Sequence, residues 1–247
     1  MNVHRSARAF DSSADLYDRV RPGYPPAAIE WLTRVLELGP GRTVVDLAAG
    51  TGKLTTALVE TGSRVIAVEP SDGMLAVLRR AAPGAEALSG TAERIPLPKA
   101  LADAVTVAQA FHWFDHDAAL AEIHRVLRPG GVLALTWNRR QLSDPAHAAL
   151  ERAISPWGSD TPRHRDRPWA SAMERTPLFA PLESQELPND QELAPGGLVE
   201  RASSISYMAA LPEETRREAL AELREYEARA PVPIVLPHVT ELLAFRR

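Results

Sequence analysis

A glycine-rich turn stands in the first quarter of the chain, in the stretch TVVDLAAGTGKL from 43 to 54. An apolar run carries Asp46, and Gly50 and Gly52 follow it with one residue between them. Glycine has no Cβ, so a turn of this kind after a strand lets a ligand approach the bare backbone. The pattern therefore predicts ligand binding through main-chain groups, and the neighbouring residues must identify the ligand.

The turn does not match a site for a nucleoside triphosphate. A phosphate-binding P-loop requires G-x-x-x-x-G-K followed by Ser or Thr, whose hydroxyl binds magnesium. Here Lys53 is followed by Leu54, and Leu47 occupies the position of the first glycine. Neither requirement is met, which excludes a P-loop at this turn.

A dinucleotide site fits the turn better, but not completely. Glu69 ends the next apolar run at about the distance expected for an acid that binds a ribose. The third glycine of G-x-G-x-x-G, however, is replaced by Thr55, and Asp46 is not part of that fingerprint. The turn alone leaves the ligand undecided.

The first two-thirds of the chain alternates predicted strands and helices, which favours crossover units and a parallel sheet. The apolar runs are continuous, as expected for strands covered on both faces. Ligands of such sheets bind beyond the carboxyl ends of the strands, where the turn, Glu69 and the stretch AQAFHWFD all lie. The pattern predicts strands over 43–47, 64–70, 85–90, 102–110 and 131–137 and helices over 25–38, 54–62, 72–81 and 115–127.

The last third has a different pattern. It predicts a helix over 145–154, a strand over 178–187, a long amphipathic helix over 212–230 and a closing sheet segment over 233–247. We expect a single domain over 1–247. Within it we expect a cofactor-binding core over 8–140, a substrate or cap region over 141–230 and a final strand over 231–247.

Composition limits the classes of function. The chain has 247 residues, 45% of them hydrophobic, a net charge of −4 and no cysteine. Disulfides, thiolate zinc sites and cysteine nucleophiles are thereby excluded. The charge gives no field that favours nucleic acid, and no apolar stretch approaches a membrane span. We expect a cytoplasmic protein, a monomer or a homodimer, with no nucleic-acid or membrane partner.

Five motifs together resemble one family. The stretches VVDLAAGTGKLT, VIAVEPSDGML, GTAERIPLP, ADAVTVAQAFHWFD and EIHRVLRPGGVLALTWN stand in the order and spacing of class I S-adenosylmethionine-dependent methyltransferases, over about 8–140. AQAFHWFD, with YDRVRPGYP from Tyr17, is most similar to the small-molecule branch that includes trans-aconitate methyltransferase-like proteins. The resemblance implies an α/β, Rossmann-like fold with a central, mostly parallel sheet and helices on both faces. It also implies an N-terminal helical lid and a C-terminal substrate-region insertion.

The resemblance also implies S-adenosyl-L-methionine as the cofactor, which has no phosphate and so needs no P-loop. Glu69 is then expected to accept both ribose hydroxyls. Thr91, Ala92 and Glu93 are expected at the adenine, and Gln109 near the methionine moiety. The expected cofactor-binding residues are Tyr17, Arg21, Asp46, Ala48, Gly50, Gly52, Glu69, Pro70, Thr91, Ala92, Glu93 and Gln109.

Several of these residues also have a purely structural interpretation. Asp46 either braces the loop or binds the amino group of the methionine moiety, since an acid in an apolar strand requires hydrogen bonds. Arg21 either pairs with the methionine carboxylate or packs with Tyr17 in the lid. His112, before Trp113, either contacts the methyl acceptor as a catalytic base or seals the core.

The predicted function is methyl transfer from S-adenosylmethionine to a small-molecule acceptor, by O- or N-methylation, with C-methylation as a further alternative. No metal is expected, because the chain has no cysteine and the acids near this turn are already assigned to the cofactor or to the loop. The alternatives are a nucleic-acid methyltransferase, a cofactor-binding module without turnover and, more distantly, an NAD-dependent dehydrogenase. The arginine-rich segment 163–167 would serve an anionic acceptor, a nucleic-acid backbone or only a solvated loop.

Overall fold

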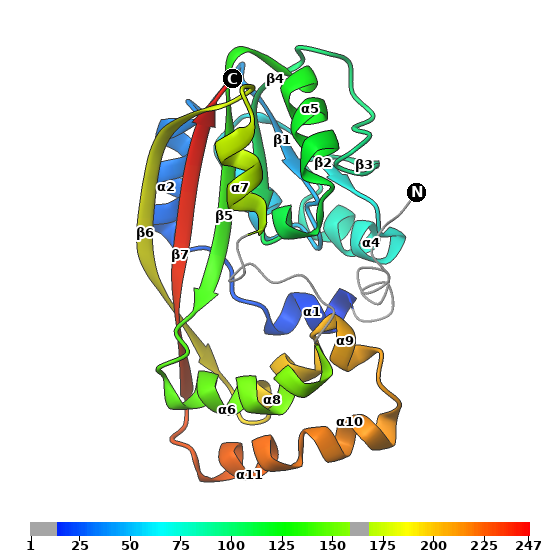
Figure 1. Cartoon of the computed structure of the whole chain (residues 1–247), viewed down its shortest axis with the longest axis vertical. Helices are drawn as coiled ribbons and strands as arrows, with labels where there is room; N and C mark the ends of the chain where they lie inside the picture. The colour runs from blue at the N-terminus through cyan, green and yellow to red at the C-terminus, as the bar shows by residue number, and fades with distance from the viewer. Residues whose placement is uncertain (1–13, 159–167) are drawn as a thin grey trace. The chain divides into compact units, whose positions relative to one another are not determined.

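The computed structural model describes residues 14–158 and 168–247 (Figure 1). The chain divides into two compact units. The sheet unit comprises 23–137, 162–187 and 240–247, and the helical unit comprises 1–22, 138–161 and 188–239. The segment 163–167, which the sequence suggested for an anion, lies outside the described residues.

The strands form one seven-stranded sheet in the order β3-β2-β1-β4-β5-β7-β6. The pairs β1–β2, β1–β4, β2–β3 and β4–β5 are parallel. Hydrogen bonds from Gln141 to Pro237 and from Arg247 to Gly131 show that β7 runs antiparallel to β5. The strands are β1 Thr43–Leu47, β2 Arg64–Glu69, β3 Glu86–Ser89, β4 Ala102–Ala108, β5 Leu127–Arg140, β6 Ala180–Leu193 and β7 Ile234–Arg246.

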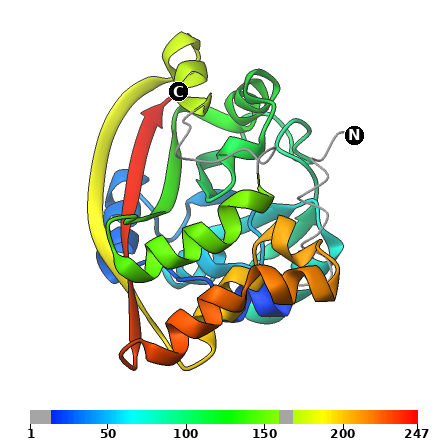
Figure 2. The same cartoon turned by 60° about the horizontal axis from the view of Figure 1, so that its bottom comes forward.

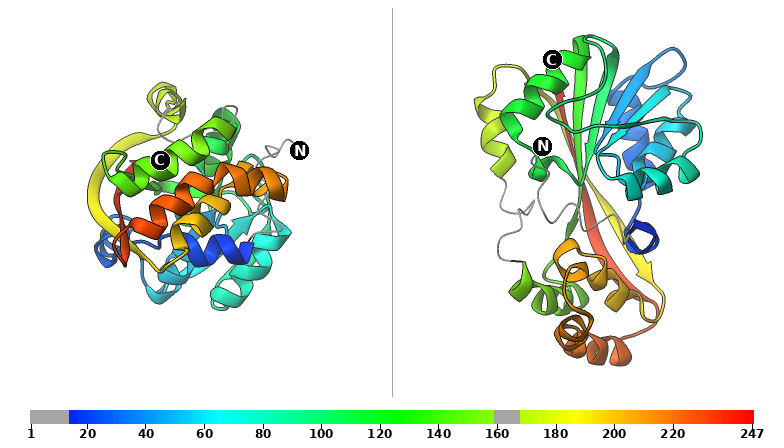
Figure 3. Two further views of the ribbon diagram at one scale, coloured as in Figure 1. Left: turned by 90° about the horizontal axis from the view of Figure 1, so that it is seen from below. Right: turned by 90° about the vertical axis from the view of Figure 1, so that its right-hand side faces the viewer.

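Helices cover both faces of the sheet unit, as Figure 3 shows. Side chains alternate along each strand, so Val44 packs with α2 (Pro26–Val35) and α3 (Lys53–Glu60). Val45 and Leu47 pack on the opposite face with α5 (His116–Val126) and α7 (Pro168–Arg175). The helix α4 (Asp72–Ala81) lies against β3 and β2. Burial on both faces explains why these strands are continuous apolar runs.

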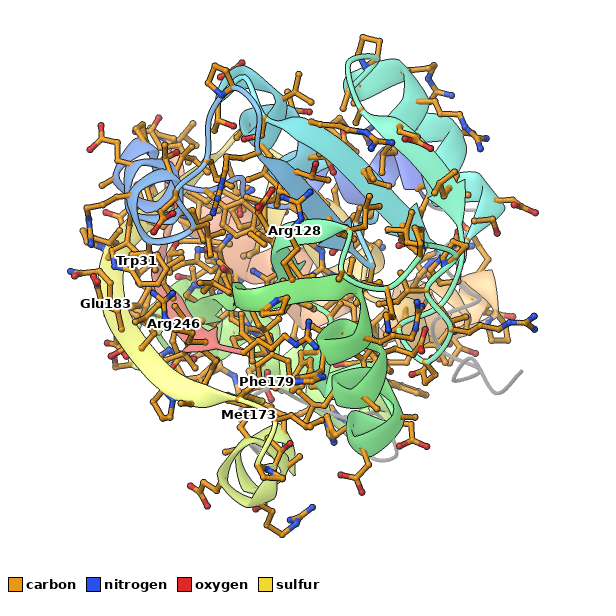
Figure 4. All side chains as sticks on the ribbon, turned by 90° about the horizontal axis from the view of Figure 1, so that it is seen from above. Trp31, Arg128, Met173, Phe179, Glu183 and Arg246 are labelled. Atoms are coloured by element: carbon orange, nitrogen blue, oxygen red, sulfur yellow. The ribbon has the colours of Figure 1, made fainter. Side chains whose placement is uncertain are left out.

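The edge strand β6 is attached to the sheet unit by polar and apolar contacts. The indole of Trp31 donates a hydrogen bond of 2.8 Å to Glu183, and Arg34 forms an ion pair of 2.6 Å with the same carboxylate. Figure 4 shows Trp31 beside Glu183, with Met173 and Phe179 together near α7. Met173 and Phe179 are both buried in the core cluster that includes α5.

The helical unit has its own apolar core, in which α11 packs on α6 and α8 (Figure 2). Buried leucines at 150, 198 and 223 come from these three helices. The helix α1 contacts α8. The helices of the helical unit are α1 Ala14–Val20, α6 Pro145–Ile154, α8 Gly197–Ser203, α9 Ser206–Ala209, α10 Glu213–Ala219 and α11 Ala221–Arg229, with the 3-10 turn Ser155–Trp157 after α6.

The α/β fold and its mostly parallel sheet confirm the prediction from sequence, and three boundaries differ. The helix expected over 212–230 is broken at Leu220, whose backbone (φ −98°, ψ 6°) leaves helical geometry. The strands β5 and β6 are longer than expected, since β5 begins at Leu127, before the glycine pair, and β6 extends to Leu193. No helix in the described part of the chain is both long enough and apolar enough to span a bilayer. The roles expected for a lid and for a substrate region stay predictions.

Candidate functional site

The carboxyl ends of four neighbouring strands meet at one edge of the sheet unit. In the register of the sheet, Leu47 lies opposite both Val68 and Val107, so β1, β2 and β4 end at the same level. The segments that follow these strands and β3 are 48–52, 69–71, 90–93 and 109–112, and we call them the carboxyl edge. The sequence predicted these segments to share one edge, and ligands of parallel sheets bind at such an edge.

The loop 48–52 has an unusual backbone. Ala48, Gly50 and Gly52 all have positive φ, at 55°, 59° and 90°. The left-handed region suits glycine, but it strains alanine by about 1 kcal/mol or more. Strain of this kind concentrates at functional sites, and nothing in the sequence indicates it at Ala48.

The two glycines serve different purposes. A Cβ added to Gly52 would lie 3.2 Å from Cγ of Leu78, and the amide of Gly52 donates to Ala49 within the loop. Gly52 therefore allows α3 and α4 to pack closely. A Cβ on Gly50 would meet only Sδ of Met74, at 4.0 Å. Of the two, Gly50 is the better candidate for close approach of a ligand to the backbone.

Glu69 is buried at the end of β2 and is held by backbone amides. The amide of Gly50 donates to Oε2 at 2.9 Å, and the amide of Ser71 donates to Oε1 at 3.0 Å. These two bonds fix the plane of the carboxylate and join the loop 48–52 to the start of α4. A carboxylate held in this way can accept from the two hydroxyls of a ribose.

Asp46 is 1% exposed and accepts two hydrogen bonds from threonines. Oγ1 of Thr55 donates to Oδ2 at 2.6 Å, and Oγ1 of Thr106 donates to Oδ1 at 2.9 Å. Burial raises the pKa of Asp46 to about 6, although both hydrogen bonds oppose the rise. Asp46 thus ties β1 to β4 and to the first turn of α3, and a role toward the amino group of the cofactor stays a prediction. The sequence did not identify its two threonine partners.

The other residues expected at the cofactor lie along the same edge. Thr91 and Arg94 close a turn after β3, Ala92 is buried, and Glu93 accepts at 3.1 Å from the amide of Asp115 at the start of α5. Pro70 is exposed beside Glu69.

Gln109 follows β4 in a strained conformation. Its φ is 61°, and its backbone N–H donates to the backbone carbonyl of Thr136 on β5 at 2.8 Å. The strain and the position fit a residue at a binding edge, and no sequence pattern indicates this backbone geometry.

His112 lies in the short 3-10 turn Phe111–Trp113 and is partly buried. Its Nδ1 accepts a long hydrogen bond of 3.5 Å from Nε1 of Trp137, whose indole stacks on Trp169 at 4.6 Å. If Nδ1 accepts, the proton of the neutral ring is on Nε2. Because Nε2 then carries the proton, this arrangement favours a role for His112 as a hydrogen-bond donor and not as a base that accepts a proton at Nε2.

Tyr17 and Arg21 belong to the helical unit, not to the sheet unit that carries the other expected residues. The guanidinium of Arg21 lies over the ring of Tyr17, with Cζ 4.8 Å from the ring centroid, and donates to the carbonyl of Ser204 at 3.3 Å. Their expected role toward the methionine carboxylate stays a prediction.

Within residues 14–158 and 168–247, no three His, Asp or Glu side chains are grouped so that they could hold a metal ion. Glu69 and Glu93 at the carboxyl edge, and Asp46 on β1, accept hydrogen bonds from backbone amides or hydroxyls.

Comparison with known proteins agrees with this geometry. Residues 45–135, which contain the carboxyl edge, match a family model described as a methyltransferase domain. An uncharacterized methyltransferase of Mycobacterium tuberculosis is 41% identical over 237 residues, covering 94% of this chain and 93% of the relative.

Two solved structures extend the comparison. One, from Anaeromyxobacter dehalogenans and described as a type II methyltransferase, has a TM-score of 0.62 at 27% identity, and the match covers 92% of this chain and 96% of that one. Geranyl diphosphate C-methyltransferase from Streptomyces coelicolor, solved with S-adenosyl-L-homocysteine, has a TM-score of 0.51 at 17% identity, with 90% and 75% covered. At 17% identity, the similarity to the Streptomyces coelicolor enzyme shows a shared fold and nothing more. The sequence relatives, the domain match and the fold together place this chain in the family of class I S-adenosylmethionine-dependent methyltransferases.

Proposed function

We propose that the chain transfers the methyl group of S-adenosylmethionine to a small-molecule acceptor, at an oxygen or a nitrogen atom. The observation that carries the proposal is the fixed carboxylate of Glu69 beside the left-handed loop 48–52. Both lie at the edge where a parallel sheet binds its ligands. The family establishes the reaction type, and the acceptor class and atom are our inference.

The residues fit the cofactor chemically. Glu69 would hold the ribose, the backbone at Gly50 would lie against the cofactor, and the segment 91–93 would enclose the adenine. The strained Gln109 after β4 would lie near the methionine moiety. When bound, the cofactor supplies a methyl group activated by a sulfonium.

The task of the protein is then mainly to position the acceptor. Holding two reactants in line and away from water accounts for about 7–11 kcal/mol of a barrier. His112 and the indole pair Trp137–Trp169 would form part of the acceptor side, with Nε2–H of His112 donating to an oxygen or nitrogen of the acceptor. A net charge of −4 supports a small acceptor over nucleic acid. The small-molecule substrate of the fold relative from Streptomyces coelicolor is consistent with this choice.

The test begins with binding and continues to turnover. Calorimetry should detect S-adenosylhomocysteine, and Glu69→Gln should weaken its binding by about 1.5–3 kcal/mol. The ribose loses a hydrogen bond to a charged group, and one of the backbone amides of Gly50 and Ser71 loses its acceptor. Glu86→Gln is the matched control, since Glu86 lies on β3 in an exposed ion pair with Arg64. Mass spectrometry of a metabolite panel, incubated with isotope-labelled cofactor, should then find a labelled small molecule. Transfer only to RNA or DNA, or binding without transfer to any acceptor, would contradict the proposal.

A further inference from the structure

Arg201, on α8 of the helical unit, is a buried cation without a counterion among residues 14–158 and 168–247. The residue is 6% exposed, and its Nε is enclosed without a hydrogen-bond partner. No described residue accepts a hydrogen bond from its guanidinium or forms an ion pair with it. Buried guanidinium groups are normally paired, because removing a charge from water is costly. Arg201 therefore requires an explanation.

The groups around Arg201 add positive charge instead of cancelling it. Burial lowers the pKa of Arg201 well below its ordinary value, and Arg21 and Arg140 lower it further. No carboxylate in the described part of the chain is among the groups that shift this pKa. Arg140 has a counterion of its own, because it pairs with Glu151 at 3.0 Å.

Arg21 is the second guanidinium with capacity to donate. Its Nε is also buried without a partner, and its pKa is lowered mainly by burial. One face of the group is covered by the ring of Tyr17. A guanidinium stacked on a ring still donates from its edge, and that edge matches the two oxygens of a carboxylate or phosphate.

Two buried histidines near Arg201 stay uncharged. Burial lowers the pKa of His147 to about 4 and that of His238 to about 3, and Arg140 and Arg201 contribute to both shifts. His147 contacts the carbonyl of Pro237, and His238 contacts that of Leu236, both at 2.9 Å. The histidines thus add no charge, and the local excess of positive charge comes from the arginines.

We propose that Arg201 and Arg21 form an oxyanion-binding site in the helical unit that takes the carboxylate or phosphate of a small molecule. The site supplies two guanidinium groups whose buried Nε atoms have no hydrogen-bond partner, and none of the carboxylates among the described residues pairs with either group. The anion is a carboxylate or phosphate group of a small molecule, and inorganic phosphate and succinate serve as probes for it. Anion binding within the helical unit does not depend on the proposed function.

The experiment measures anion binding without turnover. Thermal unfolding is followed with inorganic phosphate, succinate or sodium chloride at equal ionic strength. The wild-type Tm should rise more with phosphate or succinate than with chloride, and Arg201→Met should lose that difference, with anion affinity lower by roughly tenfold to a hundredfold. Without added anion, Arg201→Met should be at least as stable as the wild type, because an uncompensated charge is gone.

Two further variants keep the test decisive. Arg21→Met should reduce the same response, and it replaces Arg201→Met if that variant does not fold. Arg229→Met, which removes an exposed cation of α11 that pairs with Glu225, should leave the response unchanged. An equal response in all variants, or no response above chloride in the wild type, would overturn the site.

Discussion

Replacing Asp46 by asparagine should make the protein more stable at neutral pH. The carboxyl group is 1% exposed, and burial raises its pKa to about 6 from an ordinary 3.8. Each pKa unit corresponds to about 1.4 kcal/mol, so ionised Asp46 costs the folded state about 3 kcal/mol at pH 7. The neutral amide of Asp46→Asn removes that cost, and Thr55 and Thr106 can keep hydrogen bonds to it because a hydroxyl both donates and accepts.

The effect has a defined pH window. Below the unfolded pKa of 3.8 the carboxyl is protonated in both states and contributes nothing. Between 3.8 and about 6 the folded state holds its proton more tightly, so the contribution of Asp46 to stability falls as pH rises. The difference between Asp46→Asn and the wild type should thus be small at pH 4 and reach roughly 1–3 kcal/mol at pH 7.

Urea unfolding of both proteins at several pH values measures this difference. Asp103→Asn is the matched control, because Asp103 is buried on the neighbouring β4 but pairs with Arg128 at 2.9 Å and Arg42 at 3.3 Å. That variant should lose stability at pH 7. A less stable Asp46→Asn, or a difference that does not change with pH, would refute the argument. If Asp46 also binds the amino group of the cofactor, the stabilised variant should bind S-adenosylhomocysteine more weakly.

Three other perturbations test separate parts of the molecule. Gln109→Gly should stabilise the fold by about 1 kcal/mol by relieving a left-handed residue, and a simultaneous fall in activity would show that the side chain works at the site. His112→Ala should reduce kcat by less than about tenfold if the ring only donates a hydrogen bond, and a fall of about 10²–10⁴ would restore the role of a base. Burial lowers the pKa of His147 from 6.5 to about 4 in the folded state, so the unfolded state binds more protons between these pH values. The free energy of unfolding should therefore rise by about 3 kcal/mol between about pH 4 and 6.5 because of this group. His147→Gln should flatten that slope in urea titrations, and an unchanged slope would refute the assignment.

The sheet could be predicted from sequence because its signal is local and repeated. A mostly apolar run such as Val44–Leu47, followed by a glycine turn and an amphipathic helix, indicates a crossover unit in any context. The edge at which Glu69 and Gln109 lie follows from that topology alone. Parallel strands bring their carboxyl ends together, so residues that are distant in sequence meet without any further information.

The rest of the candidate site depended on geometry that no residue pattern encodes. Ala48 and Gln109 have left-handed backbones although their residue types disfavour that region. Arg201 looks in the sequence like one more polar residue on a short amphipathic helix, and only tertiary packing buries it beside Arg21 and Arg140. The break at Leu220 also lies inside a sequence with continuous helical periodicity.

Two departures from the dinucleotide fingerprint turn out to be one structural feature. Thr55 stands where the fingerprint requires Gly or Ala, and Asp46 is an acid that the fingerprint does not contain. The hydroxyl of Thr55 donates a hydrogen bond of 2.6 Å to the carboxylate of Asp46. The threonine hydroxyl offsets part of the cost of burying the acid, and the acid in turn holds the first turn of α3 against β1. Gly50, at the other side of the loop, is held by Glu69 on β2 at 2.9 Å. The loop is therefore anchored to two adjacent strands by two carboxylates. This anchoring lets it hold a strained backbone at Ala48 without a phosphate to order it.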